Sequence, residues 1–297
     1  MITLSTDRLR VTLSEPGEAP NSGFRFDRAG FISDIVLDGV HRFCASEPFY
    51  LPHPCSGGRG LCSEFLFDAG VQAGPRDDFP KFGVGLLQKE GEADYVFYKK
   101  YRSARLFPVE VTRGPDRVIF VTKPLPCLGY ALCMTKTVSV SGAAITVETS
   151  VVNVGERQVT LEEYCHNFLT IDGMAIGPGY RLSMPSIPNQ GTAKKTGRDG
   201  KPTFFLGCGS GLTFDGFSPM PAGCPIDTPP LCAAPPFCWQ LSYGETGAFV
   251  RGRDYFVPSR IYVWAADHMV CPEIFHQFTL PQGCSHSWIR TWSFDVR

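Results

Sequence analysis

The sequence has no excess of charge of either sign. Its 297 residues include 28 Lys and Arg against 29 Asp and Glu, a formal net charge of −1, and the basic residues form no continuous block. Nucleic-acid binding and attachment to an anionic membrane both depend on concentrated positive charge. We therefore expect neither a nucleic acid nor a membrane as a partner.

Long apolar runs and paired cysteine motifs are also missing. The segment from Met1 to Arg10 lacks the apolar centre of a secretory signal, and no stretch approaches the length of a membrane span, so we expect a cytoplasmic protein. The 12 cysteines include no Cys-x-x-Cys. Reduced, mostly buried thiols are therefore favoured, and a zinc site at Cys224, Cys232 and Cys238 is disfavoured. We expect no metal and no cofactor.

Long helical periodicity is the third absence. The 31 glycines and 25 prolines interrupt it throughout, whereas short alternating segments predict strands. The clearest are Arg10–Leu13, Gly23–Asp27, Gly30–Gly39 with an Asp-Gly turn, Val118–Val121, Lys136–Val140, Ile145–Val151, Arg260–Trp264 and Ser285–Val296. With 43% hydrophobic residues there is material for a large core. We predict one all-β domain over residues 1–297, with few short helices.

Three segments rich in glycine or proline carry no specific motif. Gly57-Gly58-Arg59-Gly60 either lets the backbone approach a ligand or makes a tight turn, and it lacks the Lys-Ser/Thr of a phosphate loop. Gly207–Gly211 indicates a hairpin turn and not a dinucleotide fingerprint. Pro219–Pro236 indicates a long loop that either covers a cleft or has no role in one.

Polar side chains gather in one segment, Leu161–Tyr180, between hydrophobic residues. Alternate side chains of a strand point to opposite faces, so Tyr164, His166 and Phe168 share one face and Cys165 lies on the other. A Cys165–His166 nucleophile pair is thereby excluded, because the base must reach the thiol. From the residues alone, His166 is either a site residue or an ordinary histidine of a sheet.

Several segments in order along the chain resemble the galactose mutarotase-like family, which contains aldose 1-epimerases and hexose-6-phosphate epimerases. They are Gly23–Ile32, Gly60–Phe65, Phe82–Leu87, Glu163–Phe168, and Cys271–Glu273 leading to Pro281–Gly283 and Trp288. The resemblance spans nearly the whole chain. It implies a large antiparallel β-sandwich with a sugar site on one sheet face and a small-molecule sugar as the partner.

Anomer interconversion needs one group to take the proton of the anomeric hydroxyl and another to protonate the ring oxygen. By the resemblance, His166 is the general acid and Glu273 the general base of an aldose 1-epimerase-like isomerase. The apolar neighbours of Glu273 favour a raised carboxyl pKa. Substrate contacts are expected from a further set of residues, Arg59, Asp215, Glu64 and Lys81. Whether the sugar is phosphorylated stays open, as does the oligomeric state.

Two other function classes remain at this point. The same site on the same fold can recognise a carbohydrate without turning it over, as a non-catalytic binding module. Alternatively, the chain is a β-sandwich accessory protein whose Pro/Cys-rich segment from Pro219 to Cys238 contacts a partner. An open or closed sheet face around His166 and Glu273 discriminates between the last reading and the first two.

Overall fold

The structure, a computed structural model, describes residues 1–18, 24–48, 56–91, 96, 99, 101–185, 192–196, 202–207, 211–214, 222–226 and 234–297. Within these ranges the chain is built from strands and a single short 3-10 helix, η1 (Ala69–Val71). None of the described helical residues forms a segment long and apolar enough to cross a membrane.

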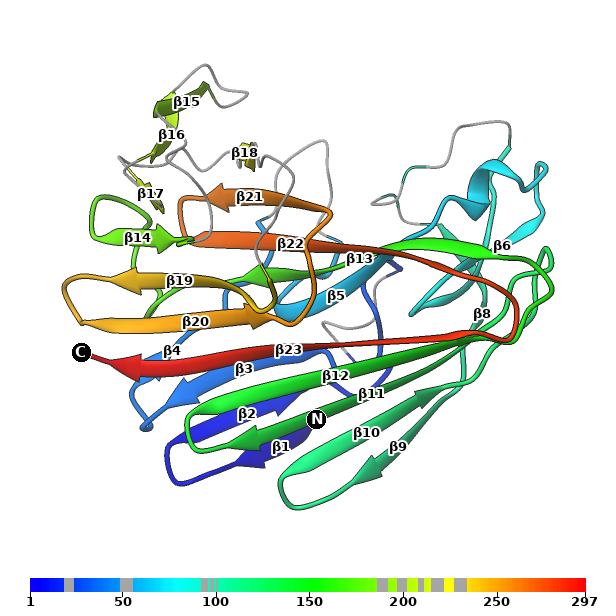
Figure 1. The fold of residues 1–297 in the computed structure, drawn as a ribbon, viewed down its shortest axis with the longest axis horizontal. Coiled ribbons are helices and arrows are strands. Elements are labelled where there is room, and N and C mark those ends of the chain that lie inside the picture. Colours follow the sequence, from blue (N-terminus) through cyan, green and yellow to red (C-terminus); the bar gives the residue numbers. More distant parts are fainter. Residues whose placement is uncertain are drawn as a thin grey trace.

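The first large sheet has nine strands, all in antiparallel pairs. In spatial order they are β1 (Ile2–Ser5), β2 (Leu9–Leu13), β3 (Ile32–Leu37), β5 (Gly60–Leu66), β13 (Val159–Phe168), β22 (Met269–Leu280), β21 (Arg260–Ala266) and β18 (Ala222–Ile226), with β4 (His41–Arg42) paired to β3. The central neighbours β5, β13 and β22 are far apart in the sequence (Figure 1).

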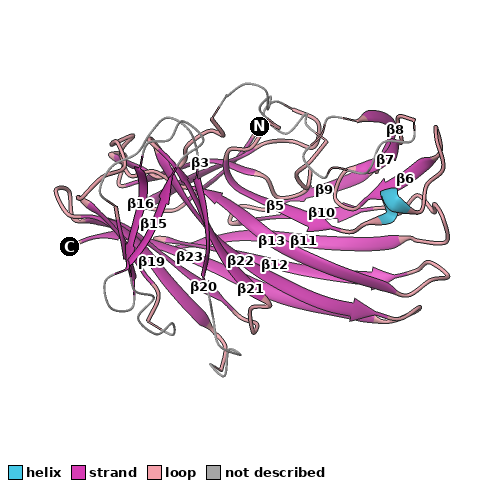
Figure 2. Ribbon diagram, turned by 90° about the horizontal axis from the view of Figure 1, so that it is seen from above, coloured by secondary structure: helices cyan, strands magenta, loops and turns pink. Residues whose placement is uncertain are grey.

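The second large sheet has eleven strands. Their order is β15 (Thr192–Thr196), β16 (Pro202–Gly207), β17 (Gly211–Thr213), β14 (Tyr180–Ser183), β19 (Phe237–Tyr243), β20 (Ala248–Asp254), β23 (Ser285–Val296), β12 (Ala144–Asn153), β11 (Leu132–Ser141), β10 (Arg117–Thr122) and β9 (Val109–Arg113). A small third sheet, β6 (Asp78–Lys81), β7 (Gly85–Gln88) and β8 (Arg102–Leu106), lies at one end of the molecule beside η1 (Figure 2).

The two large sheets enclose one core. Buried and partly exposed residues alternate along β11 and β12, because one face of these strands packs inward and the other faces outward. In β13 and β22 the alternation is replaced by continuous burial over Glu163–Phe168 and Met269–His276. Both faces of the first sheet are therefore covered at this place.

Most sequence predictions of strands are confirmed. The Asp38-Gly39 turn has φ angles of 51° and 70°, as a hairpin turn of this composition requires, and β16 and β17 pair around the glycine-rich segment 207–211. The strand predicted at Gly23–Asp27 is wrong for Phe24–Phe26, which form a bend that lies over the first sheet. The long loop predicted at Pro219–Pro236 instead contains β18, and most of its remainder lies outside the described residues.

Candidate active site

The site is built on the pairing of two neighbouring strands, β13 and β22. Their register sets Tyr164 opposite Phe275, so the next residues on the same face are His166 and Glu273. His166 Nε2 lies 3.0 Å from Glu273 Oε1. The structure thus brings together the two residues predicted as the catalytic pair, although 107 positions separate them in the sequence.

Aromatic side chains enclose the imidazole. The ring of His166 stacks on Phe168 with centroids 3.9 Å apart and an interplanar angle of 1°, and the rings of Phe26 and Trp264 lie nearly perpendicular to it. The side chains of His166 and Glu273 are only 3% and 8% exposed. His166 Nδ1 has no hydrogen-bond partner among the described residues. A buried polar atom without a partner is uncommon and is often found at functional sites.

Burial changes the protonation of both members of the pair. It raises the pKa of Glu273 to about 8, with the Glu64 carboxylate adding to the rise and the Arg25 and Arg260 charges opposing it. Burial, together with the Arg25 charge, lowers the pKa of His166 well below its usual value. Near neutral pH both shifts favour the uncharged forms, so the 3.0 Å contact sets a neutral carboxyl group beside a neutral imidazole.

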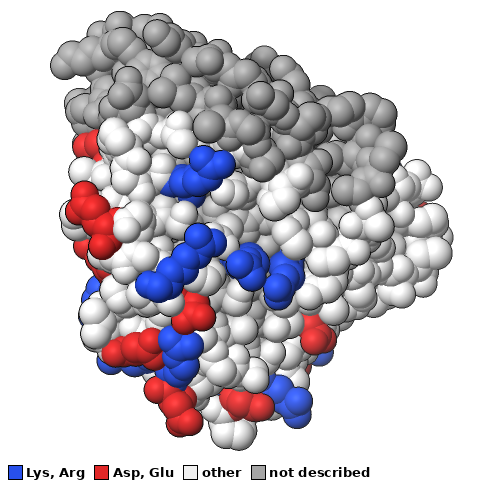
Figure 3. Space-filling view, turned by 60° about the vertical axis from the view of Figure 1, so that its left-hand side comes forward, with Lys and Arg blue, Asp and Glu red and all other residues white. Residues whose placement is uncertain are grey.

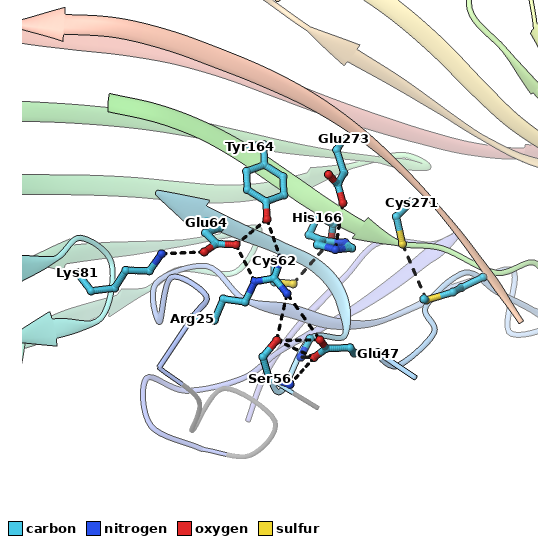
Figure 4. Close-up of polar contacts among 12 residues, drawn as sticks. Arg25, Glu47, Ser56, Cys62, Glu64, Lys81, Tyr164, His166, Cys271 and Glu273 are labelled. Carbon is cyan, nitrogen blue, oxygen red and sulfur yellow. Dashed lines mark hydrogen bonds and ion pairs between the residues drawn. The ribbon is translucent and has the colours of Figure 1, made fainter. Parts of the chain in front are cut away.

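A second carboxylate, Glu64, is the centre of a buried network beside the pair (Figure 4). Its Oε1 accepts a hydrogen bond from Lys81 Nζ at 2.7 Å, and its Oε2 accepts from Tyr164 Oη at 2.6 Å and Arg25 Nε at 2.8 Å. Burial alone would raise the pKa of Glu64, but the Lys81 and Arg25 charges outweigh it, and the pKa is lowered. Glu64 thus stays ionised while Glu273 is neutral.

Arg25 connects this network to the preceding loop. Its Nη2 donates to Tyr164 Oη at 3.0 Å and its Nη1 to Ser56 Oγ at 3.2 Å, and Nη1 lies 3.6 Å from a Glu47 oxygen. The Glu47 carboxylate in turn accepts hydrogen bonds from the backbone N–H groups of Ser56 and Gly58. Arg25 therefore fastens the segments around residues 25, 47 and 56 over the sheet.

Arg25 and Glu47 were not predicted as site residues from the sequence. Arg25 lies in a bend and Glu47 in irregular backbone after the isolated bridge at Ser46, and in neither place does strand alternation indicate the direction of a side chain. Tyr164 could have been predicted as a site residue, because it lies two residues before His166 and therefore shares its face of the strand.

One predicted substrate residue, Arg59, is not at the pair. Arg59 Nε donates to the Ser33 carbonyl at 2.7 Å and its Nη1 to Ser46 Oγ at 2.9 Å, which holds the guanidinium against β3 and the chain near residue 46. Arg59 also precedes Gly60, which pairs with Phe168, so alternation directs it away from the face of His166. Asp215 lies outside the described residues. The other two predicted substrate residues, Glu64 and Lys81, form the buried ion pair described above.

Solved structures with this arrangement of sheets cover almost the whole chain. A galactose mutarotase related enzyme from Lactobacillus acidophilus has 14% identity and a TM-score of 0.60, with 99% of this chain and 97% of the other covered. A galactose mutarotase-like protein from Lactobacillus casei has 12% identity and a TM-score of 0.59, covering 99% and 100%. The chain has the galactose mutarotase-like fold. This confirms the all-β sandwich that the sequence predicts.

A further structure with this mutarotase-like fold is a candidate aldose 1-epimerase from Escherichia coli K12, with 13% identity, a TM-score of 0.58 and coverage of 99% and 98%. No protein-family model and no curated protein matches the sequence. At these identities the likeness carries the fold and leaves the chemistry to be argued from the site itself.

Proposed function

We propose that this chain is a carbohydrate epimerase that interconverts the anomers of an aldose by opening and closing the sugar ring. The observation that carries the proposal is the His166–Glu273 contact of 3.0 Å, which places an imidazole and a neutral carboxyl group within one hydrogen bond of each other. The mutarotase-like fold supports it, because neighbours with that fold are described as mutarotase related.

The reaction needs two side chains that together carry one exchangeable proton. When the ring opens, one group accepts the proton of the anomeric hydroxyl while the other donates a proton to the ring oxygen, and ring closure on the opposite carbonyl face reverses both transfers. The two groups end with one proton between them, as they began. No redox change and no bond to the protein is involved.

The exchangeable proton of the pair begins on Glu273 in the free chain, because burial raises the Glu273 pKa and lowers that of His166. For His166 to act as the acid and Glu273 as the base, the proton must pass to Nε2 when the sugar enters. The 3.0 Å contact between the pair is the path for that transfer. A sugar that inserts its hydroxyl and ring oxygen between the two groups replaces this contact with two hydrogen bonds.

Anomer exchange by NMR tests the proposal. With free hexoses and hexose phosphates as substrates, the protein is expected to accelerate exchange of at least one sugar, and His166→Gln or Glu273→Gln to reduce the rate at least ~100-fold. Glu162→Gln is the matched control, because Glu162 lies on the same strand but binds Arg260 at the surface. If folded wild-type protein leaves the anomer exchange of every sugar at its spontaneous rate, the proposed epimerase activity is refuted.

The binding-only alternative, a carbohydrate-binding module without turnover, needs the same access to the pair as the enzyme does. Among the described residues His166 and Glu273 are only 3% and 8% exposed, and this closed sheet face by itself favours the β-sandwich accessory protein. Calorimetry separates the two functions. Sugar binding that is lost in the Arg25→Met variant, with no anomer exchange in the wild type, would establish the binding module in place of the enzyme.

A further inference from the structure

A group of arginines occupies the outward face of the second sheet, away from the candidate active site. In the strand register Arg251 of β20 pairs with Gln240 and Ser293, and Arg253 pairs with Cys238 and Thr291. Residues directly opposite each other in an antiparallel sheet share a face. The two guanidinium groups therefore lie on one face, two residues apart along one strand.

An aromatic ring ties a third arginine to this group. The guanidinium carbons of Arg251 and Arg297 lie 5.6 and 5.7 Å from the centre of the Phe249 ring, and Arg251 also donates to Gln240 Oε1 at 2.9 Å. Arg181 of β14 pairs with Ser242, which itself pairs with Phe249. We name Arg181, Phe249, Arg251, Arg253 and Arg297 the arginine face.

Three of the four arginines of the arginine face carry positive charge that no carboxylate of the described residues neutralises. None of Arg251, Arg253 and Arg297 has a carboxylate within ion-pair distance among the described residues. Asp295, which pairs with Phe249 in the register, is bound by Arg8 at 3.1 Å. The whole chain has a net charge of only −1, so this cluster is a local departure from its charge balance.

The surrounding side chains are neutral hydrogen-bonding groups. Gln240, Ser242, Thr291 and Ser293 lie beside the arginines in the register. In the space-filling view, Lys and Arg side chains gather in the middle of the face shown, with most of the acidic ones below or beside them (Figure 3). Such a surface offers charge-assisted hydrogen bonds, and its one neighbouring carboxylate named above, Asp295, is bound by Arg8.

We propose that the arginine face is an interaction surface for an acidic polypeptide segment of a protein partner. Arg251 and Arg253 are about 7 Å apart along their strand, which matches the spacing of alternate side chains in an extended peptide. Each guanidinium presents a fork that fits a carboxylate, and Phe249 adds an apolar contact between two of them. Arginine and aromatic residues are enriched at protein interfaces.

The other polyanions fit less well. Proteins that bind duplex DNA by their charge typically make roughly six to ten phosphate contacts, more than the four cations of this face. An anionic membrane would be expected to meet exposed apolar side chains without acidic neighbours, but Ile289, which is 37% exposed on the same face of β23, pairs with the exposed Glu148. The acidic segment is therefore the occupant that this surface favours.

Fluorescence anisotropy with a labelled oligoglutamate peptide tests the proposal on the full chain. Arg251→Glu/Arg253→Glu is expected to weaken binding at least about tenfold at low salt, because it replaces two contacts with two repulsions. Arg102→Glu/Arg105→Glu on β8 is the matched control, since it makes the same change of charge at two exposed positions elsewhere. It is expected to change the affinity less than about twofold.

Three results would overturn the acidic-segment proposal. The first is a wild type that does not bind the peptide at low salt. The second is an equal loss in both charge variants, which would mean attraction to the whole molecule and not to one face. The third is tighter binding of a single-stranded oligonucleotide or of anionic vesicles than of the peptide, with the same sensitivity to Arg251 and Arg253, which would assign the face to that partner.

Discussion

His166 and Glu273 meet as neutral groups, and this has a cost that depends on pH. A buried carboxyl whose pKa is about 8 must stay protonated in the folded chain at pH values where the unfolded chain would ionise it. Folding therefore opposes the ionisation of Glu273 across most of the physiological range. The protein retains this unfavourable carboxyl next to an imidazole, and the proposed sharing of one proton by the two groups explains why.

The pH dependence of stability follows from that shift. Between the ordinary pKa of 4.5 and the folded value of about 8, the folded chain binds more protons than the unfolded chain, so stability falls as pH rises through this window. Glu273→Gln removes the titration. The difference in Tm, variant minus wild type, is expected to grow from pH 4.5 to 8.

Thermal unfolding followed by circular dichroism measures this difference. Glu148→Gln, at an exposed position of β12, is the control and should give a difference that does not change with pH. Parallel curves for wild type and Glu273→Gln would mean that Glu273 is already ionised in the folded chain.

The Lys81–Glu64 pair contributes to stability differently from the ion pairs at the surface. Both side chains are almost completely buried, so Lys81→Met leaves a carboxylate with one cation fewer in a place without water, and a loss of about 3–5 kcal/mol is expected. Lys123→Met breaks an exposed pair with Glu110 and should cost less than about 1 kcal/mol.

Urea unfolding of the two lysine variants gives both free energies. A loss for Lys81→Met no larger than that for Lys123→Met would show that water reaches Glu64. The double variant Lys81→Met/Glu64→Gln is expected to recover part of the loss, because it removes the unpaired charge.

Single residues were predictable where alternation or resemblance located them. The resemblance named His166 and Glu273 together, and the structure places their side chains 3.0 Å apart, while their catalytic roles stay a prediction. Arg59 was expected at the sugar, but its guanidinium is held by Ser33 and Ser46 on another part of the sheet. The role of Arg25 depends on a bend whose course no periodic pattern reveals.

At the scale of the element, β5 depends on one glycine at its first position. Gly60 has a φ of +56°, and a Cβ atom built there would lie 2.3 Å from the Ile32 carbonyl oxygen of the neighbouring strand. A side chain would therefore push β3 and β5 apart where Ile32 pairs with Leu61. Glu64 lies on the same strand, so the network beside His166 and Glu273 would move with it.

Gly60→Ala is expected to cost more than about 3 kcal/mol and to reduce anomer exchange, because it combines a left-handed backbone with a steric clash. Gly142→Ala is the matched control. Its φ is +55°, but a Cβ atom there meets nothing within 4 Å, so only the backbone term of about 1 kcal/mol should appear. Chemical unfolding checks both, and equal losses would exclude the clash.

The elements themselves were the most predictable level. Alternation located β2, β10, β11, β12 and β23, because each has one face in the core and one outside. The predicted strand that became β3 is buried on both faces. Alternation failed at Phe24–Phe26, where the aromatic residues pack onto the sheet from a bend and so imitate the composition of a strand. It also gave no warning of β18, which has a Pro/Gly-rich sequence but pairs with β21 at the edge of the sheet.

At the scale of the whole molecule, polar contacts join the two sheets through the core. Arg290 of the second sheet donates to Glu163 Oε2 of the first at 2.7 Å and also binds Asp254 of its own sheet. Trp292 Nε1 donates to Asn167 Oδ1 at 3.0 Å. Glu163 and Asn167 lie on the inward face of β13, opposite the face that carries His166. The pairing order of the sheets brings these groups together, and it was not evident from local patterns.

Removing Arg290 should destabilise the sandwich strongly. Arg290→Met leaves Glu163 and Asp254 buried without their shared cation, and a loss of about 3–5 kcal/mol is expected. The triple variant Arg290→Met/Glu163→Gln/Asp254→Asn removes all three charges and should recover most of it. Denaturant titrations of the two proteins measure this. If the triple variant is no more stable than Arg290→Met, lost packing, not stranded charge, explains the effect.

The two sides of β13 also make the proposed epimerase activity a reporter of how the chain assembles. A slip of β13 by one position against β22 would turn the imidazole inward and expose the groups that hold the sheets together. Recovery of anomer exchange during refolding would then mark the time at which β13 and β22 pair in the correct register. Misaligned species would be compact but would not accelerate anomer exchange.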